Sequence, residues 1–72
     1  MAERPSIPPE VIIRAREAKN LKRRDVARGS GVSVYTVKAW ELGYRKPTLA
    51  TFRRAARLLG ISLDEWIRDE SE

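Results

Sequence analysis

The residues of this sequence best suited to chemistry are cations and hydroxyl side chains between Arg23 and Lys46. Arginine and lysine side chains donate charge-assisted hydrogen bonds to phosphate oxygens, and hydroxyl side chains contact the same oxygens. The stretch GVSVYTVKAWELGYRKPT, residues 31–48, joins a glycine turn, a run of mixed apolar and polar residues, and a basic cluster that ends in Pro-Thr. This pattern indicates the binding of an anion.

The sequence holds no candidate set of catalytic residues. The 72 residues include no cysteine and no histidine, and the acidic residues follow no metal-loop spacing. Thiolate nucleophiles, imidazole acid–base pairs, disulfides and ordinary zinc sites are therefore excluded, and we expect no enzyme, no cofactor and no small-molecule ligand. The apolar runs are too short for a signal peptide or membrane span, so we expect a cytoplasmic protein that binds no membrane.

The positive charge is concentrated in one part of the chain. The net charge is +5, but residues 1–46 hold eleven Lys/Arg against five Asp/Glu, and residues 47–72 hold four against five. The first part therefore carries +6 and the second −1. A basic half on a small folded domain is typical of proteins that bind a polyanion, most often nucleic acid, although some small basic proteins bind none.

The spacing of apolar residues predicts five short helices and no strand. The first is expected from Glu10 to about Lys19, with Asn20 ending it in a left-handed conformation. The second is expected from Arg23 to Arg28, where the sequence RGSG breaks it because two glycines tolerate the positive φ of a tight turn.

The three remaining helices are expected over about residues 33–42, over 49–59, and from 62 onward. Their bounds follow from the N-caps Ser33, Thr48 and Ser62 and the stop residues Gly43 and Gly60. The chain then divides into a loosely ordered lead (1–8), one all-α domain (9–68) and an acidic tail (69–72). Trp66 and Ile67 either complete the core or form a patch for self-association.

Residues 23–42 combine types that two steeply crossed helices require. Ala27 is small where the helices approach, and Gly31 permits the turn between them. Val37 and Trp40, with two further valines, form the apolar wedge that sets the direction of the second helix. This is the helix-turn-helix pattern, in which the second helix enters the major groove of DNA.

At this level of detail the sequence resembles the lambda-repressor-like (Cro-type, XRE) helix-turn-helix family from about residue 9 to residue 67. The matching segments are RAREAKNLKRRDVARGSGVSVYTVKAWELGYRKPT and LATFRRAARLLGISLDEW. The resemblance implies a compact five-helix domain with a buried ion pair between Arg16 and Glu41. The residues agree, because a carboxylate beside the Val37–Trp40 face needs a cation when it is desolvated.

Three positions depart from the family pattern. The first residue of the second helix is often Gln, and here it is Arg23; the leading edge of the third helix is usually polar, and here it holds Val34 and Tyr35. The expected contacts with DNA bases are made by Val34, Tyr35, Lys38 and Ala39. The expected contacts with DNA phosphates are made by Arg23, Ser33, Thr36, Tyr44, Arg45 and Lys46.

The sequence therefore favours a sequence-specific double-stranded DNA-binding regulator, most simply a repressor that binds as a homodimer. The alternative is an antitoxin-like or bridging protein-interaction module on the same scaffold. Arg24 and Arg28 on the second helix, and Arg53, Arg54 and Arg57 on the fourth, are interpreted mainly as surface charge.

Overall fold

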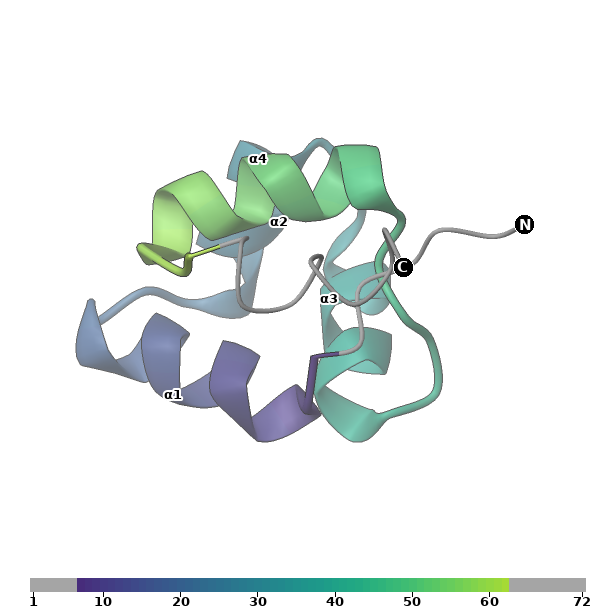
Figure 1. Ribbon diagram of the computed structural model, residues 1–72, viewed down its shortest axis with the longest axis horizontal. Helices are drawn as coiled ribbons and strands as arrows, with labels where there is room; N and C mark the ends of the chain where they lie inside the picture. Colours follow the sequence, from purple (N-terminus) through teal and green to yellow (C-terminus); the bar gives the residue numbers. More distant parts are fainter. Residues whose placement is uncertain (1–6, 63–72) are drawn as a thin grey trace.

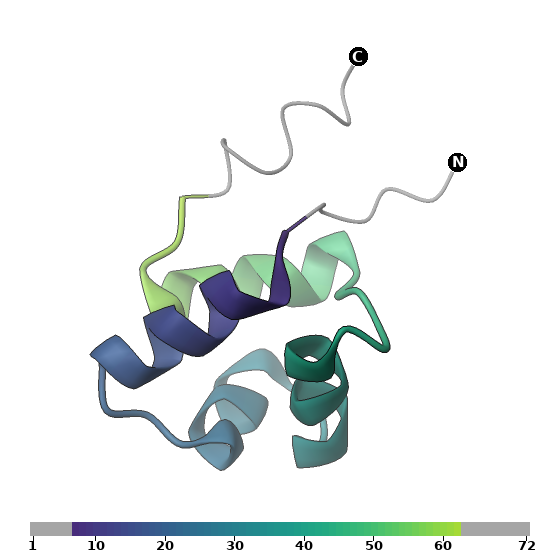
Figure 2. The same cartoon turned by 90° about the horizontal axis from the view of Figure 1, so that it is seen from below.

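The structure, a computed structural model, describes residues 7–62 and is all-α. Its helices are α1 (Pro9–Ala18), α2 (Arg23–Ser30), α3 (Val34–Leu42) and α4 (Leu49–Leu59). α2 packs against both α3 and α4, and α1 packs against the same two helices (Figure 1). Seen from below, α2 and α3 lie beside each other on one side of the layer formed by α1 and α4 (Figure 2).

Local capping sets most of the helix bounds. Pro9 opens α1, where the missing N–H of proline costs nothing, and Asn20 beyond its end has a φ of +57°. Thr48 Oγ1 accepts a hydrogen bond from the Thr51 amide at the start of α4. Gly43 and Gly60 end α3 and α4 in the left-handed conformation. These termini confirm the bounds predicted for the four helices to within two residues.

The end of α2 differs from the prediction. The helix continues through Gly29 to Ser30, and of the two glycines in RGSG only Gly31 has a positive φ, +74°. The expectation that both glycines form the turn was therefore wrong. Gly29 instead lies where α2 meets α4, since a Cβ built on it would come within 2.9 Å of Leu58 Cδ2. Glycine is therefore needed at this position for the close packing of α2 against α4, and not for the turn.

The core lies between the four helices. Val26, Val37 and Phe52 are fully buried, and Trp40 is 3% exposed. The other buried apolar residues are Ile7, Ile12, Ala27, Ala55, Ala56 and Leu59. Ile7 lies in the segment that the sequence assigned to a loosely ordered lead, yet it packs in this cluster.

The part of the chain that the structure describes holds four helices, one fewer than the five expected. The fifth, predicted to begin at Ser62, falls almost entirely outside residues 7–62, and so do Trp66 and Ile67. Among the described helices, none has the length and apolar character needed to cross a membrane.

Candidate nucleic-acid interface

One face of α3 is free of the core. Val37 and Trp40 point inward, which leaves Val34, Tyr35 and Lys38 on the outer surface. Val34 is 43% exposed and Tyr35 is 82% exposed, while Ala39 is half-buried. The structure thus brings three of the four residues expected to contact bases onto one open face and places the fourth at its margin.

The start of α3 is fixed by two hydroxyl side chains. Ser33 Oγ accepts a hydrogen bond of 3.1 Å from the Thr36 amide, and it lies 3.0 Å from Thr36 Oγ1. This N-cap satisfies one of the amides that an α-helix leaves unpaired in its first turn. The positive end of the helix dipole is therefore presented at the exposed end of α3, where an anion is favoured.

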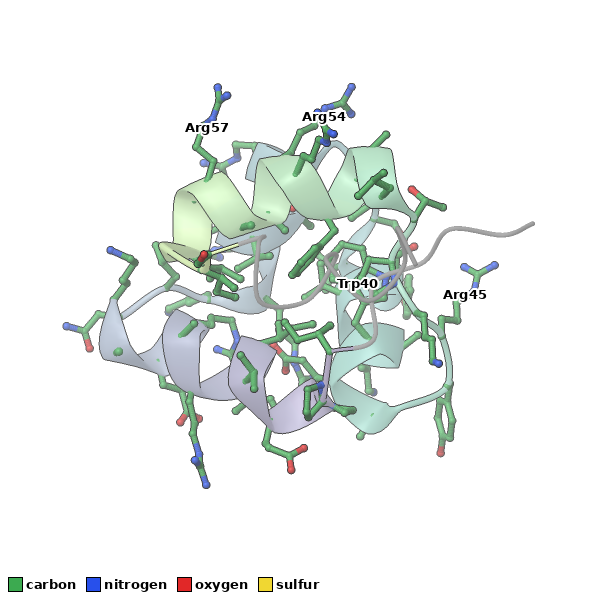
Figure 3. All side chains as sticks on the ribbon, in the orientation of Figure 1. Trp40, Arg45, Arg54 and Arg57 are labelled. Atoms are coloured by element: carbon green, nitrogen blue, oxygen red, sulfur yellow. The ribbon has the colours of Figure 1, made fainter. Side chains whose placement is uncertain are left out.

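A hollow of about 170 Å³ lies between this helix start and the loop that leads to α4. Thr36 and Trp40 line its α3 side, and Arg45, Lys46 and Thr48 line its loop side. Val32, Pro47 and Thr51 complete the lining. Two cations, three hydroxyl groups and the N-terminus of α4 therefore surround one small open space, which suits a phosphate group. In Figure 3 Trp40 lies inside the fold, whereas Arg45 projects outward from the loop.

The remaining expected phosphate residues lie elsewhere. Tyr44 is 79% exposed and follows Gly43 at the end of α3, outside the lining of the hollow. Arg23 opens α2, and its guanidinium lies against Glu41: Nε is 2.8 Å from Oε1. The sequence assigned Arg23 to phosphate alone, so this contact with α3 was not foreseen.

Glu41 is shared by two arginines. Its side chain is fully buried, and Arg16 Nε donates to Oε2 at 2.7 Å while Arg16 Nη2 donates to Oε1 at 3.3 Å. Arg16 Nη1 also donates to the carbonyl oxygen of Leu21 at 3.0 Å. The forked contact satisfies both carboxylate oxygens, as burial of a charge requires.

This cluster ties three helices together at the edge of the interface. Arg16 comes from α1, Arg23 from α2 and Glu41 from α3. The side chain of Arg16 is only 15% exposed, whereas that of Arg23 is 38% exposed. The two arginines therefore differ in access: Arg16 is enclosed by the fold, while more than a third of the Arg23 side chain is open to solvent.

Sequence reasoning missed two residues of the hollow and one buried polar group. Thr48 was expected only as a helix cap and Thr51 was not considered, although both follow the basic cluster within one helical turn. Ser30 is fully buried, and its hydroxyl has no hydrogen-bond partner among the described residues. No local feature of the sequence predicts that Ser30 is buried, because it follows a glycine in a polar segment.

The comparisons with known proteins agree with this architecture. The model of a helix-turn-helix family matches residues 12–66, more than half of the chain, whereas no curated protein and no solved structure matches. The matched range includes the start of α3, the hollow lined by Arg45 and Lys46, and the Arg16–Glu41 pair. The chain therefore belongs to the lambda-repressor-like (XRE) helix-turn-helix family of DNA-binding regulatory domains.

Proposed function

We propose that this protein is a sequence-specific regulator of transcription that inserts α3 into the major groove of duplex DNA. The observation that carries the proposal is the outer face of α3, where Val34, Tyr35 and Lys38 are exposed together. An α-helix fits the major groove, where lysine can donate to guanine and an apolar group can contact the thymine methyl. These residues are suited to reading base edges.

The phosphate contacts would flank this helix on two sides. Arg45 and Lys46 lie in the loop before α4, next to the hydroxyls of the hollow, and Arg23 lies at the start of α2. Contacts of this kind fix the register of a protein on DNA without specifying sequence. Tyr44 would contact the backbone next to this hollow, and Ser33 would do so at the start of α3.

We further propose that the protein acts as a homodimeric repressor. A dimer related by a two-fold axis would place two α3 helices in successive major grooves on one side of the duplex. Occupation of such a site within a promoter would exclude other proteins from it. Repression is then the simplest consequence of binding.

Selection from randomised duplexes, followed by footprinting of the enriched sequences, tests both parts of the proposal. We expect a palindromic site whose half-sites lie about 10 bp apart, centre to centre. The matched control is the variant with Tyr35→Asp and Lys38→Asp, which alters only exposed residues of α3 and should enrich no sequence. If the variant selects the same duplex as the natural chain, α3 is not the reading helix.

A second function, binding a protein partner through α3, is favoured by the exposed apolar surface of Val34 and Tyr35. Aromatic residues are enriched at protein interfaces. Backbone amide NMR spectra recorded with and without the enriched duplex distinguish the two functions. Shifts centred on residues 33–39 support DNA reading, and their absence would favour the antitoxin-like or bridging role.

A further inference from the structure

A second cationic cluster lies on α4, apart from the proposed DNA-reading surface. Arg53, Arg54 and Arg57 line an open hollow of about 230 Å³, and Gly29 of α2 is the other described residue that lines it. All three arginines are exposed. Within residues 7–62, every side chain that lines this space is therefore that of an arginine, and the space is large enough to admit an anionic group.

The helix geometry explains why these arginines gather. Phe52, Ala55 and Ala56 turn into the core, so the residues between and after them project from the opposite side of α4. Arg54 also extends toward the turn before α3. A Cβ built on Gly31 in that turn would lie 3.2 Å from Nη1 of Arg54. Gly29 of α2 lines the same space with its backbone.

The cluster carries an electrostatic cost that an anion would remove. Arg53 and Arg57 are four residues apart, and like charges at this spacing destabilise a helix. A guanidinium stays protonated at all physiological pH values, so the cluster cannot relieve the repulsion by losing a proton. A bound polyanion would relieve it.

The chemistry of the lining selects phosphate over a protein surface. Arginine binds phosphate through two parallel N–H donors, a geometry that matches its planar fork. The centres of protein interfaces instead hold aromatic and aliphatic anchors, and none of the described residues that line this hollow is of that kind. Duplex DNA supplies closely spaced phosphates that three neighbouring guanidiniums can meet at once.

The cluster faces a different direction from the first interface. Figure 3 shows Arg54 and Arg57 projecting from the side of α4 that is turned away from α1, while Arg45 projects from the loop between α3 and α4. We propose that Arg53, Arg54 and Arg57 form a second, sequence-independent site for duplex DNA. A molecule bound through α3 would then hold a second duplex through α4 and bridge the two.

A capture experiment tests this site with the full chain. One duplex carrying the enriched sequence is immobilised, protein is added, and a second labelled duplex of random sequence is offered. The test variant is Arg53→Gln with Arg54→Gln and Arg57→Gln. The matched control, Arg14→Gln with Lys19→Gln and Arg24→Gln, removes three exposed cations elsewhere and leaves the same net charge.

We expect the natural chain and the control to capture the second duplex. The amount of second duplex captured by the α4 variant should be at least tenfold lower. Binding of the α4 variant to the immobilised duplex should stay within twofold of the natural value. The log–log salt slope for the second duplex should fall by about 3, from about 0.9 per phosphate contact. Equal losses in the two variants would show a general charge effect and overturn the proposal.

Two further measurements separate this site from α3 and from other partners. The variant with Tyr35→Asp and Lys38→Asp should still bind random duplex weakly, and adding the three α4 substitutions should weaken that binding at least tenfold further, because only the phosphate contacts of Arg23, Arg45 and Lys46 then remain. This result would stand even if α3 were not the reading helix. If poly-glutamate of matched charge competes as well as duplex does, the site fits an acidic protein and the duplex proposal fails. Capture that persists in the α4 variant would also overturn it, since a dimer could then bridge through two α3 helices.

Discussion

Arg23 Nε lies 2.8 Å from Glu41 Oε1, so the residue that opens α2 is bound to the carboxylate that Arg16 holds from the other side. The contact links the fold directly to the proposed DNA interface. The Arg23 side chain is partly exposed at the surface where a phosphate is expected, and its contact with the buried carboxylate restrains its direction. A long side chain restrained in this way loses less conformational entropy when it meets DNA.

Glu41→Ala should lower the free energy of unfolding by about 3 kcal/mol, because it leaves Arg16 nearly enclosed without a counter-charge. Urea denaturation at neutral pH measures the loss. The double variant Arg16→Met with Glu41→Leu should recover much of it, since an apolar pair replaces a buried ion pair at little cost. A Glu41→Ala protein as stable as the natural chain would show that the carboxylate is solvated.

Arg23→Ala should weaken binding to the enriched duplex and to a random duplex by the same factor. Its proposed partner is a phosphate, which is present in every sequence, so the log–log salt slope should fall by about one per subunit. Competition binding with both duplexes at several salt concentrations measures this. Arg24→Ala is the control, because Arg24 is the exposed neighbour of Arg23 and lacks the contact with Glu41. A loss confined to the enriched duplex would contradict the phosphate role of Arg23.

Lys38→Ala should cost about 1–3 kcal/mol on the enriched duplex and relax the preference at one or two base pairs. Lys38 lies one helical turn after Val34 on the exposed face of α3, where its ammonium reaches toward base edges. Repeating the duplex selection with this variant identifies the relaxed positions. If Lys38→Ala loses affinity equally for all duplexes, its ammonium contacts phosphate and another residue of α3 reads the base.

Ser30→Ala should raise the free energy of unfolding by about 1 kcal/mol, because it removes a buried hydroxyl that has no hydrogen-bond partner among the described residues. Thermal unfolding followed by circular dichroism measures the change. Ser33→Ala is the contrasting variant: it removes the N-cap of α3 and should lower stability by about 1 kcal/mol. If both serine variants lose stability alike, the Ser30 hydroxyl is paired in solution.

The bounds of the helices and much of the core could be predicted from the sequence. An N-cap accepts from amides of the first turn, and a C-cap donates to carbonyl oxygens of the last turn. The type of residue at Ser33, Thr48, Gly43 or Gly60 is therefore sufficient to indicate where a helix begins or ends. The apolar stripe of α4 likewise repeats with the period of the helix, and its inward residues are buried as expected. These features depend on neighbours in sequence.

The features that the sequence left undecided depend on residues far apart in the chain. Arg23 and Glu41 are 18 residues apart, and only the crossing of α2 and α3 brings their side chains together. Ile7 enters the core because α1 directs the preceding segment onto the other helices, not because of any local period. The sequence predicts mainly surface charge for the arginines of α4, and only the packing of α4 against α2 shows that they line one hollow together with Gly29. A local pattern specifies a helix and its faces, but the angle at which two helices pack decides which side chains meet, and that angle is set by the whole core.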